Sequence, residues 1–283
     1  PATVTQPPIL VWAVKRIYSV TQDKDWLRAC LPYLQGYLAW NLKNRDQNGN
    51  NLFEWYIEHH LFCRSGESGM DNSPRFDLAI PLDAVDFSAM MAYEYEALAE
   101  LADQLHDASL AASSREHQRR ITAAIESILW DPQQNFYMDR DHQGQFTDVL
   151  ALSGFLPLMT AGPTKERVEA LASHLNNPAT FGTPVPVPSV SLNHGTYSKD
   201  MWRGPTWINI NYLIAEGFER HSRPAEAKSI VDRSIQAVEK AYLKTGCIYE
   251  YFDSLDVTHP ADLDRKQRFV HRAGFTPISD YHW

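Results

Sequence analysis

The chain has 283 residues, with 26 Lys and Arg against 35 Asp and Glu, so its formal net charge is −9 at pH 7. This length suffices for one large domain with a sizeable core. The acidic balance argues against sequence-independent nucleic-acid binding, which needs clustered basic residues. No apolar run approaches the roughly 18 to 20 residues that span a bilayer. The three cysteines are far apart and form neither a disulfide framework nor a paired-cysteine metal site.

The pattern of apolar residues predicts an all-α protein. Apolar residues recur at helical spacing over 26–38, 86–105, 121–129, 152–159, 165–175, 207–218 and 224–238. Pro32 is expected to break or kink the first of these helices, and Asp86 to cap the second. Residues 135–146 read as a hairpin that turns at Gln143-Gly144. Buried and half-exposed helices alternate, which predicts concentric helical layers in a single domain over residues 1–283.

Two long connections, 44–85 and 176–203, carry unusual residue clusters, and loops of this length in a compact domain are usually functional. The first cluster, 67–75, holds Asp71 between Gly69 and Asn72, with Arg75 close by. Asp71 could be a placed acid, although Gly, Asn, Ser and Pro also form ordinary turns.

The other two clusters combine charge with aromatic side chains. Residues 201–207 place Arg203 between Trp202 and Trp207, either as a sugar-binding group or as the start of a buried helix. Residues 249–253 set Glu250 among aromatic side chains. An apolar setting tunes a carboxyl group for acid or base work, but a hydrogen-bonded structural Glu looks the same. Two carboxylates on separate loops with aromatic neighbours suggest a glycosidase.

These clusters resemble glycoside hydrolase family 63. The run Glu-Ser-Gly-Met-Asp-Asn-Ser-Pro-Arg at 67–75 is similar to the acid loop of that family. Trp-Arg-Gly-Pro-Thr-Trp at 202–207 resembles its Tyr-Trp-Arg-Gly-Pro segment, and Tyr-Glu-Tyr-Phe at 249–252 resembles its base segment. Thr-Gln-Pro-Pro at 5–8 looks like the start of one family helix. The segments occur in the family's order, and the likeness is strongest to the bacterial branch with mannosylglycerate and glucosylglycerate hydrolases; trehalases are more distant.

The resemblance implies an (α/α)6 barrel that hydrolyses an α-glucoside or α-mannoside with inversion and without a cofactor. Asp71 would be the general acid and Glu250 the general base. Gln6, Trp202 and Arg203 would contact the sugar, and we include Arg75 of the acid loop with them. The expected partner is a small oligosaccharide or glycoside, not a nucleic acid or a membrane. No signal peptide is visible, so we expect a cytoplasmic protein.

Some positions depart from the family pattern. Gly66 stands where the family often has an aromatic residue, and Met201 stands where it usually has Tyr. A Trp-rich segment and a final helix of the family have no counterpart, so the barrel is expected to be incomplete at both ends. A sugar-binding protein without hydrolytic activity, a trehalase-like hydrolase and a protein-binding helical scaffold are the alternatives. The scaffold predicts that the two long loops lie apart, whereas an enzyme requires them to converge.

Three smaller features are interpreted as structural. Asp46, Asn48 and Asn50 alternate as in calcium loops, but position six (Asn51) is not Gly and position twelve (Ile57) is not acidic. A polar turn is favoured over a calcium ion held with distant ligands. The adjacent His59 and His60 point in different directions and have no third partner at metal-ligand spacing. Cys63 is interpreted as a small buried apolar residue and not as a nucleophile.

Overall fold

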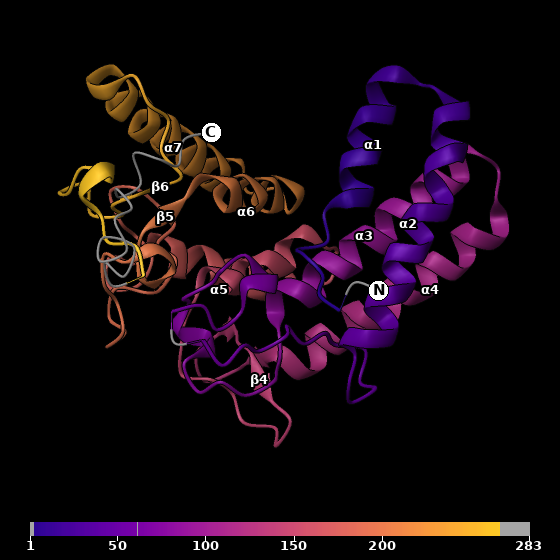
Figure 1. Cartoon of the computed structure of the whole chain (residues 1–283), viewed down its shortest axis with the longest axis horizontal. Helices are drawn as coiled ribbons and strands as arrows, with labels where there is room; N and C mark the ends of the chain where they lie inside the picture. Colours follow the sequence, from indigo (N-terminus) through magenta and orange to yellow (C-terminus); the bar gives the residue numbers. More distant parts are fainter. Residues whose placement is uncertain (1–2, 61, 267–283) are drawn as a thin grey trace.

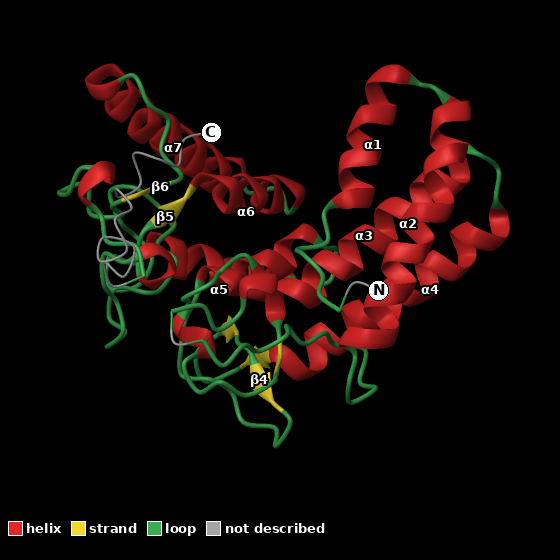
Figure 2. Ribbon diagram, viewed as in Figure 1, coloured by secondary structure: helices red, strands yellow, loops and turns green. Residues whose placement is uncertain are grey.

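The computed structural model describes residues 3–60 and 62–266. Helices dominate it (Figure 2): α1 (Leu10–Thr21), α2 (Lys24–Arg45), α3 (Val85–Gln104), α4 (Ala108–Ala124), α5 (Lys165–Asn176), α6 (Ile208–Arg220) and α7 (Pro224–Thr245). Shorter helical segments are η1 (Gly66–Ser68), η2 (Pro74–Phe76), η3 (Ile125–Leu129), η4 (Leu152–Met159), η5 (Met201–Arg203) and η6 (Pro260–Asp262). Within the described part, no helix is both long and apolar enough to cross a membrane.

The strands are two residues long and pair antiparallel. They are β1 (Leu82–Asp83), β2 (Trp130–Asp131), β3 (Phe136–Tyr137), β4 (Arg140–Asp141), β5 (Thr206–Trp207) and β6 (Tyr251–Phe252). The pairs are β1 with β4, β2 with β3, and β5 with β6. The predicted hairpin forms between residues 140 and 146, where the Asp141 N–H donates to the Gln145 carbonyl. These pairs are too short to build a sheet core, so they serve to join loops.

The helices form two layers. In Figure 1 they follow one another from α1 and α2 on the right, through α3, α4 and α5, to α6 and α7 on the left. An inner row consists of α1, α3, η4 and α6, each packed on the next, while α4 lies against α3 and α7 lies against α6. Helix α3 is buried on most of its faces, whereas α4 and α7 each have one apolar face. The predicted all-α architecture with concentric layers is confirmed.

Close packing explains the composition of the inner row. All eight residues of η4 are buried, and a Cβ atom at Gly154 would lie only 2.2 Å from the Phe136 ring. A side chain at this position would push the inner row away from β3. The short side chains of α3, many of them Ala, let its neighbours approach in the same way.

Two predictions about helix boundaries differ from the structure. Helix α2 continues through Pro32, so the predicted break there is wrong. The helix begins at Lys24, where Asp23 caps it by accepting the N–H groups of Asp25 and Trp26. Helix α3 begins at Val85, so Asp86 lies inside its first turn and does not cap it. The Asp86 side chain instead turns inward to an arginine described below. A buried ionic contact has thus replaced the local cap that the sequence suggested.

The first helix is held by a carboxylate on another helix. Glu94 of α3 is fully buried, and its oxygens accept the N–H groups of Val11 at 2.7 Å and Trp12 at 2.8 Å. These donors belong to the first turn of α1, which has no side-chain cap of its own. Burial raises the pKa of Glu94 to about 7, although the backbone N–H groups of Trp12, Val11 and Leu10 act in the opposite direction. Glu94 therefore fixes the start of α1 against α3.

We expect Glu94 to make stability depend on pH. Its folded-state pKa lies above its ordinary value of 4.5, so the folded protein binds the proton more tightly. The free energy of unfolding should then fall, by up to about 3 kcal/mol, as the pH rises from about 4.5 to about 7. Urea unfolding at pH 5 and pH 8 will show this fall in the wild type and a smaller one in Glu94→Gln. Equal falls in both proteins would contradict it.

Candidate active site

The two long loops meet. Asn72, in the first loop, accepts the N–H of Trp202 at 3.1 Å through its side chain. The Asn72 carbonyl accepts a second hydrogen bond from the Arg203 guanidinium, also at 3.1 Å. The acid loop and the segment 201–207 therefore share one surface. This convergence is what an enzyme requires, and it contradicts the helical-scaffold alternative, which predicted that the loops lie apart.

The third cluster joins them through β5 and β6. Thr206 pairs with Phe252 and Trp207 with Tyr251, which places Glu250 directly beside the segment 201–207. The rings of Trp202 and Trp207 stack with centroids 3.7 Å apart, and Tyr251 packs on Trp207 at 4.8 Å. Three aromatic rings in a row thus fix the spacing between the two clusters.

Asp71 and Glu250 are bound to neighbouring residues of one segment. The Lys266 ammonium lies 2.8 Å from an Asp71 oxygen, and the Arg265 guanidinium lies 3.0 Å from a Glu250 oxygen. The Asp71 and Glu250 side chains are 24% and 19% exposed. Because Arg265 and Lys266 are consecutive, the two predicted catalytic carboxylates face the same stretch of chain. Both remain accessible to a ligand.

The N-terminal segment lies beside the acid loop. Gln6 is exposed, and Tyr37 donates its hydroxyl to the Gln6 carbonyl at 2.9 Å. Gly69 adopts a φ of +71°, which favours glycine, and a Cβ atom there would be 3.6 Å from Pro7. Gln6 therefore has a fixed backbone and an exposed side chain, on a segment that lies against the acid loop at Gly69.

The predicted contacts Trp202 and Arg203 are already engaged by protein groups. Trp202 is only 3% exposed and stacks on Trp207. Arg203 makes a bidentate ion pair with Asp77 at 2.8 and 2.7 Å, and its side chain is 19% exposed. Arg203 is partly exposed and lines the small hollow. The Trp202 ring is buried against Trp207, so its main role is to support this segment.

The structure differs from the expectation for Arg75. Its side chain has no exposed surface, and it makes bidentate ion pairs with Asp86 at 2.8 Å and with Asp139 at 2.6 and 2.9 Å. Asp139 also accepts the Val85 N–H, and Asp86 accepts the Trp55 indole N–H. Arg75 thus ties the acid loop to the start of α3. It cannot reach a sugar without leaving two buried carboxylates unpaired, so we assign it a structural role.

Cys63 adjoins the site without the properties of a nucleophile. Burial, together with the Asp71 charge, raises the pKa of the Cys63 thiol to about 11. A thiol with so high a pKa is protonated at neutral pH and reacts poorly. This agrees with the interpretation of Cys63 as a packing residue.

The structure shows the surroundings of the two departures from the family pattern. A Cβ atom at Gly66 would lie 3.0 Å from Glu58 Oε1 and 3.3 Å from Cys63 Sγ, so these two side chains would have to shift slightly for a larger residue. The Met201 side chain is buried, and its backbone adopts the left-handed conformation with a φ of +46°. The Met201 carbonyl accepts the Trp207 indole N–H at 3.0 Å. Strained backbone of this kind persists where surrounding contacts hold it. Here it aims Trp202 and Arg203 at the acid loop.

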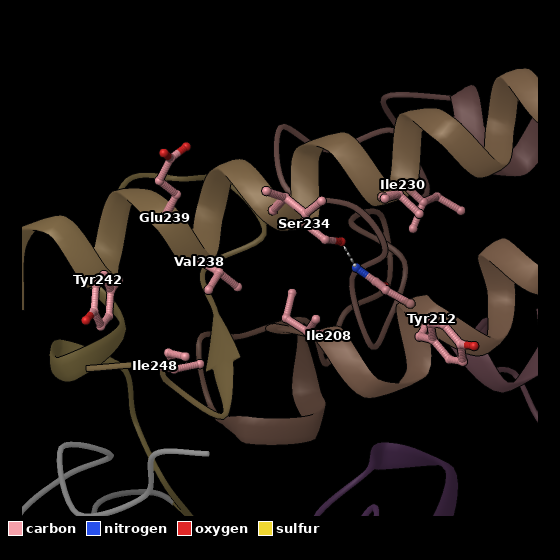
Figure 3. Close-up of a pocket in the computed structure, with 11 residues that line it drawn as sticks. Ile208, Tyr212, Ile230, Ser234, Val238, Glu239, Tyr242 and Ile248 are labelled. Atoms are coloured by element: carbon pink, nitrogen blue, oxygen red, sulfur yellow. Dashed lines mark hydrogen bonds between the residues drawn. The ribbon is translucent and has the colours of Figure 1, made fainter. Parts of the chain in front are cut away.

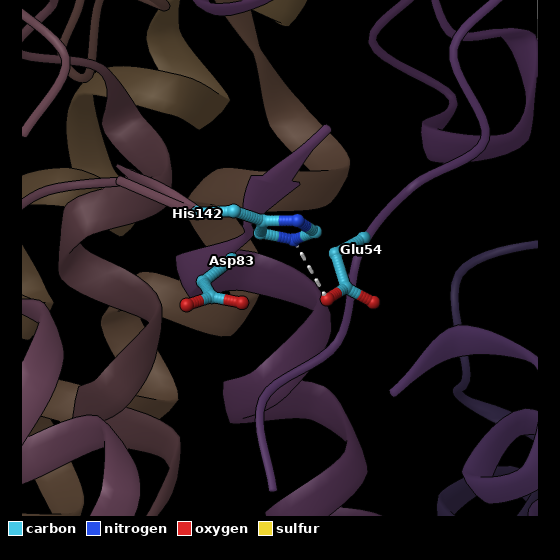
Figure 4. Close-up of side chains that lie close together, drawn as sticks. All are labelled: Glu54, Asp83 and His142. Atoms are coloured by element: carbon cyan, nitrogen blue, oxygen red, sulfur yellow. Dashed lines mark hydrogen bonds and ion pairs between the residues drawn. The ribbon is translucent and has the colours of Figure 1, made fainter. Parts of the chain in front are cut away.

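One group of side chains in the described part has the composition of a cation site. Glu54, Asp83 and His142 place ligand atoms within 4.8 Å of one another (Figure 4). Burial raises the pKa of Glu54 to about 7, with Asp83 acting in the same direction. The amides of Asn48 and Asn50 donate to Asp83 at 3.0 and 2.8 Å. Oxygen and imidazole ligands suit a divalent cation. The two amide hydrogen bonds, however, also provide the Asp83 carboxylate with partners in the absence of an ion.

Three hollows adjoin these elements. A small one of about 20 Å³ lies among Arg64, Asn72, Arg203 and Lys266. A second of about 190 Å³ borders Glu250. The largest, about 570 Å³, lies between α6 and α7 (Figure 3). Its lining is mostly aliphatic, with few polar groups to orient a sugar.

Comparison with known proteins agrees with this arrangement. A profile of the mannosylglycerate hydrolase MGH1-like glycoside hydrolase domain matches residues 1–262. The mannosylglycerate hydrolase of Rubrobacter radiotolerans is 27% identical, over 92% of this chain and 71% of that protein. An uncharacterized protein of Borreliella burgdorferi is 26% identical, over 81% of this chain and 46% of its own length. The GH63 mannosylglycerate hydrolase of Thermus thermophilus, solved with glucose, superimposes with a TM-score of 0.78 at 25% identity, covering 90% of this chain and 71% of that one.

The architecture is therefore that of the helical-barrel glycoside hydrolases, and the predicted (α/α)6 barrel is confirmed. The chain belongs to the MGH1-like family of glycoside hydrolase domains, within glycoside hydrolase family 63. It spans about half the length of the Borreliella relative and about 70% of the Rubrobacter protein.

Sequence reasoning missed several residues that build the site. Glu67 stands within the acid loop but had received no role, although its carboxylate is one of the most densely hydrogen-bonded groups near the site. Arg265 and Lys266 lie in a segment with no recognisable pattern. Arg64 forms no ion pair within the described part of the chain and borders the small hollow. Only Glu67 had a usable signal, namely its place in the acid-loop motif.

We expect Arg75→Met to lower the free energy of unfolding strongly. The change leaves Asp86 and Asp139 buried without their cation, which costs about 3–5 kcal/mol. Urea unfolding measures this loss, and Arg120→Met on the exposed face of α4 is the control. A variant with unchanged stability and a raised KM would instead support the earlier expectation that Arg75 contacts the sugar.

Proposed function

We propose that this domain hydrolyses an α-glycosidic bond with inversion of configuration. Asp71 protonates the glycosidic oxygen, and Glu250 takes a proton from the water that attacks the anomeric carbon. Family membership supports hydrolysis. The observation that supports the residue roles is the convergence of Asp71 and Glu250 on the adjacent residues Arg265 and Lys266.

The two carboxylates have surroundings that suit different tasks. Asp71 pairs with Lys266, which lines the small polar hollow together with Asn72 and Arg203, where a sugar hydroxyl finds hydrogen-bond partners. Glu250 borders a separate hollow with Asn209 and Tyr249, which gives a water molecule its own approach. An inverting enzyme needs this separation, since acid and water act on opposite faces of the sugar. Lys266 and Arg265 must yield to substrate for the carboxylates to act.

The substrate that this site fits is a glycoside whose aglycone carries a carboxylate. The Rubrobacter and Thermus relatives are named mannosylglycerate hydrolases, and glycerate is an anion at neutral pH. Arg64 faces the small hollow beside Asn72 and Lys266 and has no ion pair among the described residues. A guanidinium that lines this hollow is suited to bind a carboxylate through a charge-assisted hydrogen bond.

Asp71→Asn and Glu250→Gln should each reduce kcat by about 10²- to 10⁴-fold, because each removes one proton-transfer group. The measurement is the turnover of a panel of α-mannosides, α-glucosides and trehalose. The panel includes glycosides of glycerate and of neutral aglycones. Asp148→Asn and Glu169→Gln on the exposed surface are matched controls. NMR should show the β-anomer of the sugar released first.

Near wild-type kcat in either variant would contradict that role. First release of the α-anomer would contradict inversion. Sugar binding by calorimetry without any turnover would favour the sugar-binding alternative.

Arg64→Gln should discriminate between charged and neutral aglycones. We expect KM for a glycerate glycoside to rise about tenfold, because a charge-assisted hydrogen bond is lost. KM for the methyl ester of the same glycoside should stay within twofold. This pair of substrates serves as an internal control, since misfolding would affect both. An equal change for both substrates would show that Arg64 does not select the carboxylate.

A further inference from the structure

Glu67 lies where four parts of the chain meet. One of its carboxylate oxygens accepts the Thr5 N–H and the Arg45 Nη2, both at 2.6 Å. The other accepts the Arg45 Nε at 2.9 Å and the Tyr56 N–H at 2.8 Å. The Glu67 side chain is 1% exposed. Each carboxylate oxygen accepts two of the four hydrogen bonds. A change in the position or charge of this carboxylate therefore affects all of the connected segments at once.

Arg45 gives this junction a rigid base. It is the last residue of α2, and its side chain is 8% exposed. Its remaining donors reach the carbonyls of Asn44 and Thr3, both at 2.9 Å. The guanidinium also lies 4.9 Å above the Trp40 ring. Because the planar guanidinium is held on all sides, it fixes the orientation of the Glu67 carboxylate.

The same junction holds the backbone of Gln6. The Thr3 carbonyl is bound by Arg45, the Thr5 N–H by Glu67, and the Gln6 carbonyl by Tyr37. None of these bonds uses the Gln6 side chain, which forms no hydrogen bond within residues 3–60 and 62–266. The segment is thus anchored by its main chain, and the Gln6 amide is left available for a ligand.

Glu67 also belongs to the acid loop. It is the middle residue of η1, which is followed by Gly69, two residues before Asp71. Past this turn, the Asp71 carbonyl accepts the Arg64 N–H at 2.8 Å. One carboxylate therefore joins the backbone that carries Gln6 to the backbone that carries Asp71.

We propose that Glu67, held by Arg45, is a positioning residue that sets the distance between Gln6 and Asp71. This inference rests on the proposed function, in which Gln6 binds the sugar and Asp71 protonates the bond to be cleaved. Catalysis depends steeply on such spacing, since a misplacement of about 1 Å can cost about 10²-fold in rate. Glu67 itself touches no substrate, because it is buried.

The chain offers a matched control. Glu94 is also a buried glutamate, and it also accepts two backbone N–H groups from the N-terminal part of the chain, those of Val11 and Trp12. It fixes α1, which carries no predicted site residue. Glu67→Gln and Glu94→Gln make the same chemical change. In each, an amide N–H₂ replaces an acceptor oxygen and faces backbone donors.

The experiment compares these variants on the substrate that the wild type hydrolyses best. Glu67→Gln should lower kcat/KM at least tenfold. Glu94→Gln should change it less than threefold, even where the two lower Tm equally. In addition, Gln6→Ala should raise KM in the wild type but have less than half of that fold effect in Glu67→Gln. A merely structural role of Glu67 would leave the effect of Gln6→Ala unchanged.

If Glu67→Gln does not fold, Arg45→Lys tests the positioning role instead. This variant keeps the positive charge but loses the bidentate hydrogen bonds of the guanidinium to Glu67. It should lower kcat/KM at least fivefold and reduce the effect of Gln6→Ala in the same way. The inference is overturned if kcat/KM of Arg45→Lys stays within twofold of the wild type. It is also overturned if Gln6→Ala has the same fold effect on KM in Arg45→Lys as in the wild type.

Absence of turnover in the wild type would overturn the proposed function instead. Calorimetry with the sugar then decides the inference. Glu67→Gln must weaken sugar affinity as Gln6→Ala does, and equal affinity in Glu67→Gln and wild type would overturn it.

Discussion

The site depends on a buried arginine that no ligand contacts. Arg75 lies between Asp86 and Asp139 with no exposed surface, and it joins the acid loop, the first turn of α3 and the strand region after β3. Each carboxylate also accepts a backbone N–H, which helps to stabilise two carboxylates that share one guanidinium. Such a cluster stabilises little over an apolar core of the same shape, but removing one partner leaves an uncompensated buried charge at high cost. Arg75 therefore anchors the acid loop where it meets the barrel.

A second buried ion pair extends this anchoring toward the substrate. Arg45 and Glu67 connect the end of α2 to the N-terminal segment and to η1. The acid loop is thus held at both of its ends, by Arg75 after Asp71 and by Glu67 before it. Asp71 itself faces Lys266 at an exposed edge. The protein combines a fixed backbone with an accessible carboxylate, which is the condition for a preorganised acid.

Helical spacing was sufficient to predict the helices and their layers, because apolar faces follow from periodicity. It failed at Asp86, whose side chain pairs with the buried Arg75, and at the break predicted at Pro32, through which α2 continues. The motifs predicted which loops converge, and Asn72 joins them as the family order implies. They did not separate contact residues from supports. Arg75 and Arg203 are both arginines beside turns, and only the buried partners of Arg75, on segments far away in sequence, assign it to the framework.

The hydrogen bond from the Trp202 N–H to Asn72 spans 130 positions of the chain. Loop closure over such a distance carries a large entropic cost and forms late in folding. The acid loop leaves the ribosome long before its partners at 202 and 250 are synthesised. A partly made chain therefore contains Asp71 without the segments near 202 and 250, and the candidate site is assembled only after all three have been synthesised and brought together.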